Sequence, residues 1–366
     1  MMVIFYWTAV ILIFYTYFGY PLLIALMSVL YGKIVAKQWI YPRISLIIAA
    51  HNEEKDIAKK LRDSLNLDYP QDKYEIVVVS DGSTDNTNDI VRNFQDSGIR
   101  LLALPERKGK TSAQNEAVKS AKGDILIFSD ATTVFQKDTI KQMVSNFADN
   151  NVGGVGAELI YVNKNKTATG EGTGLYWKYE KFLRKKESEV SSLIGVSGCA
   201  YAIRKSLYEE IDTSLISDFV AAQMIYSKGK RVVFESEAIV YEETNSKIKD
   251  EFKMRVRVAT RSLYGLWYMR KLLNPFKYGM YAVQLISHKL LRYLMPLFLV
   301  FLFLTNIVLL VKGFGYRVFL LVQIVFYLSA LIQGVTKYFC TMQIALLMAL
   351  VNFLHGEKNV LWKPQR

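Results

Sequence analysis

The segment YEIVVVSDGSTD, at Tyr74–Asp85, decides the fold because a buried strand ends in it and a polar turn begins. Its apolar half is rich in β-branched residues, as expected of a strand that is covered on both faces. A second run of the same kind, ISLIIAA at Ile44–Ala50, ends in the polar residues HNE. Parallel sheets bind ligands at the carboxyl ends of their strands, so these polar endings are the first candidates for a functional site.

Strands and helices alternate on either side of this segment. The expected strands are 44–50, 74–80, 99–104 and 124–130, and the expected helices are 53–65, 85–94 and 110–121. Such a β-α-β-α order predicts an α/β fold with a doubly wound, mostly parallel sheet.

Both ends of the chain are apolar. Residues 1–32 carry no charged side chain and are long enough to cross a bilayer. We expect an uncleaved anchor, because no basic segment precedes this stretch and no small-residue cleavage site follows it. Three more charge-free stretches, Tyr293–Val311, Val318–Thr336 and Tyr338–Leu354, lie near the other end. The first two predict membrane spans, whereas the third is short and carries Gln343, which favours an in-plane or re-entrant segment.

These observations divide the chain into four parts. We expect an anchor at 1–32, a soluble domain at 33–273, an amphipathic in-plane helix at 274–292 and a membrane region at 293–366. Basic residues flank the soluble domain, and the positive-inside rule then places that domain in the cytoplasm.

Composition excludes several classes of protein. The hydrophobic fraction of 51% rules out a disordered chain. Two distant cysteines give no disulfide framework, and three scattered histidines give no histidine-built zinc site. The net charge of +13 is explained by anionic lipid headgroups and an anionic nucleotide substrate, and it requires no nucleic-acid partner.

Three motifs in a fixed order carry a family resemblance. NEE begins at Asn52 after the first strand, SDGSTD begins at Ser80 after the second, and KGKTSAQN covers Lys108–Asn115. At these spacings the set resembles the nucleotide-sugar half of family 2 glycosyltransferases, which have the GT-A fold. The resemblance covers Ile44–Ala259. The flanking apolar segments are similar to the membrane-integrated, synthase-like branch of that family.

The resemblance assigns a nucleotide-sugar site in which Glu53 and Asp81 hold the uracil and the ribose. Lys110 stands at the start of a predicted helix, where the helix dipole and free N–H groups favour phosphate. The alternatives are an ordinary Asp-Gly turn at Asp81 and a solvated basic face around Lys110. The residues assigned to the nucleotide sugar are Asn52, Glu53, Asp81, Lys110, Asn115, Asp130, Arg255 and Arg257.

Asp130 ends the fourth predicted strand in the position of the family's DxD motif. The resemblance therefore implies a Mg²⁺ or Mn²⁺ cofactor on the donor diphosphate, with Asp130 as its ligand. Thr132 stands where a second carboxylate is usual, so a hydroxyl group or water would have to complete the metal shell.

The resemblance assigns the acceptor side to Ser197, Gly198 and Cys199, where small residues let a sugar approach the backbone. Cys199 itself is expected to be a buried small residue and not a nucleophile. Asp218 stands in the position of the family's catalytic base, with Ser217 where a glutamate is usual. One carboxylate is enough to deprotonate an acceptor hydroxyl, and the rival interpretation makes Asp218 a helix N-cap.

Arg255 and Arg257 lie where processive synthases carry a Gln-x-x-Arg-Trp motif, but Met254 and Val258 replace the Gln and the Trp. Guanidinium groups suit a diphosphate leaving group, and the alternative is a basic face on an interfacial helix. The missing Trp, which would be a stacking platform for the acceptor, argues against a processive synthase.

We therefore expect an inverting, hexosyltransferase-type glycosyltransferase that is integral to the plasma membrane and acts in surface polysaccharide synthesis. Its donor would be a nucleotide sugar, UDP-linked by resemblance, and its acceptor a glycan or a lipid-linked saccharide. Membrane lipids, a second copy of the chain and an export partner are further candidate partners. Two alternatives stay open: a processive synthase that extrudes its product, and a non-catalytic sugar-nucleotide-binding assembly subunit.

Overall fold

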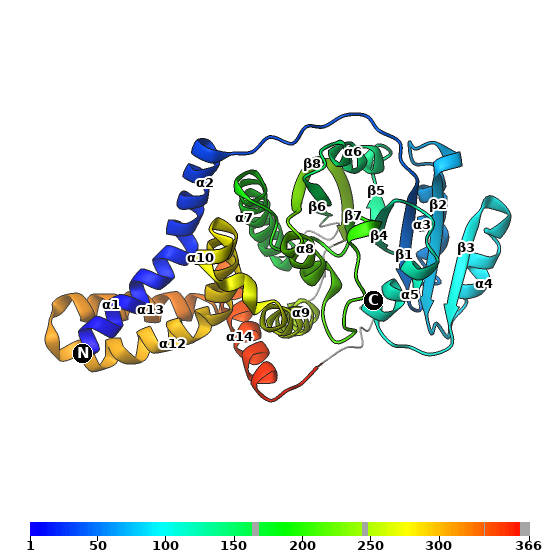
Figure 1. Cartoon of the computed structure of the whole chain (residues 1–366). Coiled ribbons are helices and arrows are strands. Elements are labelled where there is room, and N and C mark those ends of the chain that lie inside the picture. The colour runs from blue at the N-terminus through cyan, green and yellow to red at the C-terminus, as the bar shows by residue number, and fades with distance from the viewer. Residues whose placement is uncertain (163–167, 244–247, 333, 359–366) are drawn as a thin grey trace. The chain divides into compact units, whose positions relative to one another are not determined.

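A computed structural model describes residues 1–162, 168–243, 248–332 and 334–358 of the chain (Figure 1). Their contacts divide them into two compact units. The sheet unit contains the described parts of 32–162 and 184–243, and the helical unit contains those of 1–31, 163–183 and 244–358.

An eight-stranded sheet forms the centre of the sheet unit, with strand order β3-β2-β1-β4-β7-β6-β8-β5. The first four strands in this order are parallel, as the sequence predicts, and apolar residues cover both of their faces. The strands are β1 Ile44–Ala50, β2 Tyr74–Asp81, β3 Ile99–Leu104, β4 Ile125–Asp130, β5 Val134–Phe135, β6 Val152–Val162, β7 Ala200–Arg204 and β8 Arg231–Glu243.

Helices cover this sheet. Helix α5 packs on β1 and β2, whereas α6 and α8 pack on β6 and β8. The α-helices of the unit are α3 Ile57–Leu65, α4 Thr87–Arg92, α5 Lys110–Ser120, α6 Thr139–Ser145 and α8 Ser217–Ser227. Helix α7 runs over Ala168–Val190, and its residues 168–183 belong to the helical unit. Short 3₁₀ turns lie at Gln71–Lys73 (η2), Gln95–Ser97 (η3), Asn146–Ala148 (η4) and Lys205–Leu207 (η5).

The second half of the sheet is mixed rather than parallel. Strand β7 runs antiparallel to both β4 and β6, and β5 runs antiparallel to β8 with Val134 opposite Tyr241. The residues 197–199, which the sequence assigns to the acceptor side, form a loop that precedes β7, since this strand begins at Ala200. This antiparallel arrangement brings the end of β8 beside the turn that follows β4.

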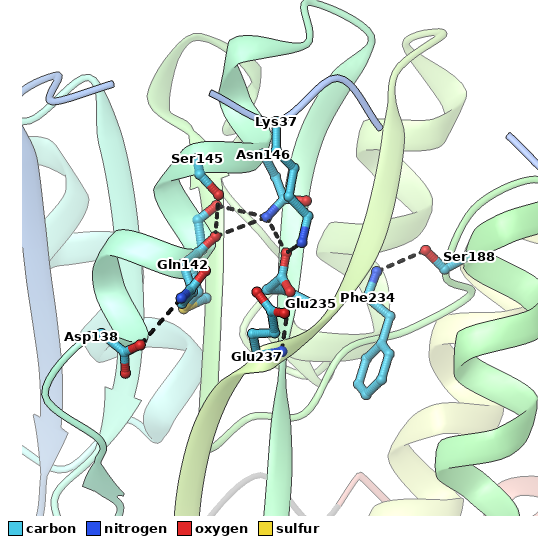
Figure 2. A network of polar contacts seen from close by, with 10 residues as sticks. Lys37, Asp138, Gln142, Ser145, Asn146, Ser188, Phe234, Glu235 and Glu237 are labelled. Carbon is cyan, nitrogen blue, oxygen red and sulfur yellow. Dashed lines mark hydrogen bonds and ion pairs between the residues drawn. The ribbon is translucent and has the colours of Figure 1, made fainter. Parts of the chain in front are cut away.

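The chain between residues 32 and 43 is extended and is fastened to the sheet unit by a buried carboxylate. Glu235 in β8 is 1% exposed, and its Oε2 lies 2.6 Å from Lys37 Nζ and accepts a 2.7 Å hydrogen bond from Asn146 Nδ2 (Figure 2). Its Oε1 accepts a 3.1 Å bond from the N–H of Glu237. Both carboxylate oxygens therefore have partners within the sheet unit.

The helical unit contains three helices that are long and apolar enough to cross a membrane: Met2–Tyr31, Met280–Lys312 and Val335–Leu354. The helix α13 Phe314–Ser329 is apolar but shorter. The sequence favoured the stretch Val318–Thr336 as a membrane span over the stretch Tyr338–Leu354. In the structure the helix over the last stretch, Val335–Leu354, is the longer one and is long enough to cross a membrane. One residue of the expected second span, residue 333, lies outside the described residues.

Two of the long helices contain a π-helical turn. The first comprises α1 Met2–Phe14, η1 Tyr15–Gly19 and α2 Tyr20–Tyr31, and the second comprises α11 Met280–Leu285, η7 Ile286–Leu290, α12 Leu291–Leu309 and η8 Leu310–Lys312. The π turns are joined where Tyr15 Oη lies 2.8 Å from Ser287 Oγ. The rest of the unit comprises α9 Ile248–Tyr268, η6 Arg270–Leu273, α10 Pro275–Tyr278 and α14 Val335–Leu354.

The expected in-plane helix at 274–292 is divided in the structure. Residues 280–292 form the beginning of the helix that continues to Lys312, and a separate orientation in the membrane plane stays a prediction. Within this region the buried Glu180 carboxylate lies 3.2 Å from His288 Nε2 and 3.1 Å from Arg292 Nη1. The charges at the start of this apolar helix are thus paired inside the helical unit.

Candidate active site

Polar side chains gather past the carboxyl ends of β1, β2 and β4, as the sequence predicts. At the centre, Lys110 at the start of α5 forms an ion pair with Asp130 at the end of β4. The Lys110 ammonium also donates a 3.1 Å hydrogen bond to the carbonyl oxygen of Gly198. The Lys110 and Asp130 side chains are 26% and 29% exposed, so a ligand in solution can reach this pair.

Asp218 reaches the same place from the first turn of α8. A Cβ atom on Gly198 would lie 2.5 Å from Asp218 Oδ2 and 3.1 Å from Lys110 Nζ, so both charged atoms converge above this glycine. Among the described contacts, no side chain caps α8, whose N-cap residue is Ile216. The N-cap interpretation of Asp218 therefore does not describe its position, and its carboxylate lies against Gly198, which was predicted for the acceptor side.

The charges of the two aspartates act on Lys110. Burial lowers the pKa of the Lys110 ammonium, but the nearby charges of Asp130 and Asp218 outweigh burial and raise this pKa above its ordinary value. The side chain is therefore a permanent cation at neutral pH. A cation held between two carboxylates is suited to a substrate that brings its own negative charge.

Glu242, at the end of β8, is a site residue that the sequence motifs did not reveal. Its carboxylate accepts hydrogen bonds from Thr132 Oγ1 at 3.1 Å and Thr133 Oγ1 at 3.3 Å. The Cys199 thiol donates to Glu242 Oε2 at 2.6 Å. Burial raises the pKa of Glu242, and the charge of Asp130 raises it further. A second carboxylate thus stands beside the Asp130–Thr132 segment, supplied by a different strand.

Cys199 is partly exposed rather than fully buried as predicted, and its expected lack of nucleophilic reactivity stays a prediction. Burial, followed by the charges of Glu242 and Asp130, raises the pKa of its thiol well above the ordinary value. The protonated thiol donates a hydrogen bond and is a poor nucleophile. Ser197 is buried in the same loop, and its carbonyl oxygen accepts the 3.3 Å bond from the N–H of Ala200 at the start of β7.

Asp130, Thr132 and Glu242 fit a divalent metal ion in part. Among the residues that the structure describes, no three His, Cys, Asp or Glu side chains gather closely enough to hold a metal by themselves. Two neighbouring carboxylates raise each other's free energy when both are ionised, and a divalent cation relieves this repulsion. The site therefore offers two carboxylate ligands and requires further oxygen ligands from a substrate or from water.

The predicted nucleotide residues after β1 and β2 do lie together. Asn52 adopts a left-handed backbone with φ of 55°, and its Oδ1 accepts a 2.8 Å bond from the N–H of Thr84. The buried Glu53 has its N–H bonded to Thr87 Oγ1 at 2.8 Å. Asn tolerates left-handed backbone better than most residues. These bonds join the two polar turns and fix the position of Glu53.

Asp81 is buried at the end of β2 and fixes the loop that leads to Lys110. Its two carboxylate oxygens accept hydrogen bonds from the N–H groups of Lys108 at 2.7 Å and Gly109 at 2.8 Å. A Cβ on Gly82 would lie 2.6 Å from the backbone nitrogen of Arg107, so the turn requires glycine here. Asp81 thus orients the start of α5, and its contact with a nucleotide base stays a prediction.

Asn115 and the two arginines are placed differently from the central residues. The Asn115 amide is buried, donates to the Ile211 carbonyl oxygen at 2.7 Å and accepts from Tyr208 Oη at 2.5 Å, so it fixes the 208–211 segment. Arg255 and Arg257 belong to α9 in the helical unit. Arg255 Nε donates to Glu251 Oε1 at 2.9 Å. The nucleotide-binding roles of these three residues stay predictions.

Lys60 on α3 is a buried cation near this site. Its ammonium donates to the Thr133 carbonyl oxygen at 2.7 Å and lies 4.0 Å from the centre of the Phe135 ring. Burial lowers the pKa of Lys60 to about 7, against the opposing effect of the Asp130 and Glu242 charges. Lys60 thereby supports the turn between β4 and β5 from the protein interior.

Comparison with known proteins identifies the domain. Residues 45–212 match the sequence profile described as Glycosyl transferase family 2. A Bacillus subtilis protein named "Probable glycosyltransferase YdaM" is 29% identical over 245 residues, which cover 61% of this chain and 56% of that protein. A poly-beta-1,6-N-acetyl-D-glucosamine synthase from Staphylococcus epidermidis is 27% identical over 222 residues, covering 59% of this chain and 53% of the synthase. The chain thus spans about half the length of these curated relatives.

A solved structure shows the same fold over nearly the whole chain. The mannosyltransferase PcManGT from Pyrobaculum calidifontis, in complex with GDP-Man and Mn²⁺, superimposes with a TM-score of 0.76 at 23% identity. The match covers 96% of this chain and 99% of that one. Residues 45–212 are therefore similar to family 2 glycosyltransferases, and the chain shares the GT-A fold and has helices long and apolar enough to span a membrane.

Proposed function

We propose that this protein is an inverting hexosyltransferase that moves a sugar from a UDP-linked donor to a glycan or lipid-linked acceptor. The reaction takes place at the cytoplasmic face of the cell membrane during surface polysaccharide synthesis. The observation that carries this proposal is the convergence of Asp218, Lys110 and Asp130 above Gly198. A base, a cation and a donor-side carboxylate are the groups that sugar transfer from a diphosphate requires.

In the proposed reaction, Asp218 accepts the proton of the acceptor hydroxyl as that oxygen attacks the anomeric carbon. The new carbon–oxygen bond forms on one face of the sugar while the bond to the diphosphate breaks on the other, which inverts the anomeric configuration. The bonding electrons leave with the nucleoside diphosphate, and the Lys110 ammonium stabilises this charge. Arg255 and Arg257 are further candidates for the same role.

Asp130 and Glu242 would hold a Mg²⁺ or Mn²⁺ ion together with diphosphate oxygens. When bound, this ion would offset the negative charge that develops on the leaving group. The absence of a second carboxylate at Thr132 is thus compensated by Glu242, whose side chain bonds to the Thr132 hydroxyl.

The helical unit supports an acceptor that is available at a membrane. Its three long apolar helices favour an integral membrane protein, and the basic flanks of the sheet unit favour a cytoplasmic site. The poly-beta-1,6-N-acetyl-D-glucosamine synthases among the relatives support polysaccharide synthesis and keep a processive synthase as the second candidate. Val258, which stands where the synthase motif carries a Trp, keeps single addition as the first.

The experiment is to purify the full chain in detergent and measure nucleoside diphosphate release from a panel of UDP- and GDP-sugars, with and without Mn²⁺ and membrane lipid extract. The Asp218→Asn protein is the test variant, and Asp72→Asn, at an exposed position in η2, is the matched control. We expect metal-dependent turnover of one UDP-sugar that falls at least about a thousandfold in Asp218→Asn and is unchanged in Asp72→Asn.

Two results would contradict the proposal. Turnover that persists in Asp218→Asn would remove the base from the mechanism. No turnover of any donor in the presence of the lipid extract would favour the non-catalytic assembly subunit instead.

A further inference from the structure

The position of Lys110 suggests a role before the donor arrives. Its ammonium forms an ion pair with Asp130, which is the predicted metal ligand, and donates to Gly198 on the acceptor loop. The same nitrogen shares its surroundings with Asp218 Oδ2, the predicted base. One cation thus connects the donor side, the acceptor loop and the base.

This arrangement conflicts with metal binding by the same carboxylate. An ammonium that is paired with Asp130 and a divalent cation on Asp130 repel each other at short range. A lysine side chain, however, is a point charge on a flexible stem and can exchange one anionic partner for another. The Lys110 side chain is 26% exposed, which leaves space for its amine to move.

We propose that Lys110 is an internal cation that occupies Asp130 until the donor diphosphate draws its ammonium away, thereby admitting the metal. This inference rests on the proposed function and goes beyond it, because it makes metal binding depend on prior or simultaneous nucleotide binding. Linkage then requires that nucleotide and metal strengthen each other's binding.

The test measures Mn²⁺ binding by electron paramagnetic resonance, with and without UDP, on the full chain in detergent. The variants are Lys110→Met, Lys110→Arg and the control Lys119→Met, which changes an exposed lysine of the same helix that pairs with Glu116. We expect Lys110→Met to bind Mn²⁺ alone about tenfold more tightly than the wild type, because Asp130 is no longer occupied. Its UDP affinity should fall, and its gain in Mn²⁺ affinity upon UDP addition should shrink about tenfold.

The opposite signs of these two changes separate this role from a merely structural one, which would weaken Mn²⁺ and UDP binding together. Lys110→Arg should retain the weak binding of Mn²⁺ alone, since it keeps the positive charge, and Lys119→Met should match the wild type. Unchanged or weaker Mn²⁺ binding in Lys110→Met, with both ligands bound by the wild type, would overturn this inference and leave the proposed function standing. A wild type that binds neither UDP nor Mn²⁺ would overturn both.

Discussion

Two of the glutamates on strand β8 of the sheet unit, Glu235 and Glu242, have surroundings that differ in kind. Glu235 is paired with the Lys37 ammonium and receives N–H groups from Asn146 and Glu237 (Figure 2). Glu242 receives two hydroxyl groups and a thiol, and it faces the charge of Asp130.

The two sites differ in whether a charged side chain of the protein bonds directly to the carboxylate. At Glu235 the Lys37 ammonium does so, and this residue has a structural role. At Glu242 the direct donors are neutral, and the charge of Lys110 that acts on it is shared with Asp130. A second carboxylate is near, so a further cation from solution would lower the energy of the site. The same residue type on one strand thus has a structural role in one place and a proposed ligand role in the other.

The largest expected effect is on transfer activity and comes from changing Glu242, the proposed metal ligand. Glu242→Gln should lower metal-dependent sugar transfer about a hundredfold, because it removes one of two carboxylate ligands. The thermal stability should be unchanged or higher, since the variant relieves repulsion with Asp130. Initial rates over a series of Mn²⁺ concentrations, together with a thermal melt, measure both effects. An unchanged metal dependence would give Glu242 a structural role like that of Glu235.

At Glu235 we expect a change to lower the stability and to leave the activity nearly unchanged. Glu235→Ala should lower the free energy of unfolding by about 2–3 kcal/mol, because the buried Asn146 amide loses its acceptor and Lys37 loses its partner. Transfer activity per folded molecule should stay within about twofold of the wild type. Denaturant unfolding in detergent and activity at a temperature well below the melt give the two numbers. A large loss of activity with intact stability would contradict the distinction.

The buried amine of Lys60, which lies near Glu242, should make the stability of the protein depend on pH. Burial lowers the pKa of Lys60 to about 7 in the folded protein, whereas the ordinary lysine value is 10.5. Between these values the unfolded chain binds more protons, so the folded state gains stability as the pH rises above about 7. Compared with Lys60→Met, the wild type should therefore gain stability from pH 7 to pH 8.5, by at most about 1.4 kcal/mol per pH unit. The same change of stability with pH in the wild type and in Lys60→Met would refute this expectation.

The smallest expected effect is at Lys37. Its side chain is 41% exposed, so water screens its ion pair with the buried Glu235. Lys37→Met should cost less than about 1 kcal/mol of unfolding free energy, well below the effect of Glu235→Ala. A double-mutant cycle between the two positions measures their coupling. A loss of unfolding free energy as large as that of Glu235→Ala would show that Lys37, and not the Asn146 amide, holds the Glu235 carboxylate in place.

The parallel half of the fold could be predicted closely from the sequence. The expected strands at 44–50 and 99–104 agree with β1 and β3, and those at 74–80 and 124–130 differ from β2 and β4 by one residue. Long runs of buried β-branched residues produce this clear signal. The mixed half has no such signal, because β6 pairs antiparallel with β7 and parallel with β8 across large sequence separations.

The functional site, too, could be predicted from the sequence only in part. The motifs around Lys110, Asp130 and Asp218 led to a cluster that the structure assembles, because each stands just after a strand or at the start of a helix. Glu242 could not be found in this way, since it lies within an ordinary strand and reaches Thr132 through the pairing of β5 with β8. A search for a carboxylate to replace the one missing at Thr132 would have required knowledge of that pairing.

The most direct test of the central claim is the anomeric configuration of the bond formed by the wild-type protein. The sugar from an α-linked UDP donor would be transferred to acceptor in a lipid extract, and the first product would be analysed by proton nuclear magnetic resonance. Direct displacement with Asp218 as the single base predicts a β-linked product. An α-linked product would contradict this mechanism, because retention requires either a second displacement or departure of the leaving group on the face of attack.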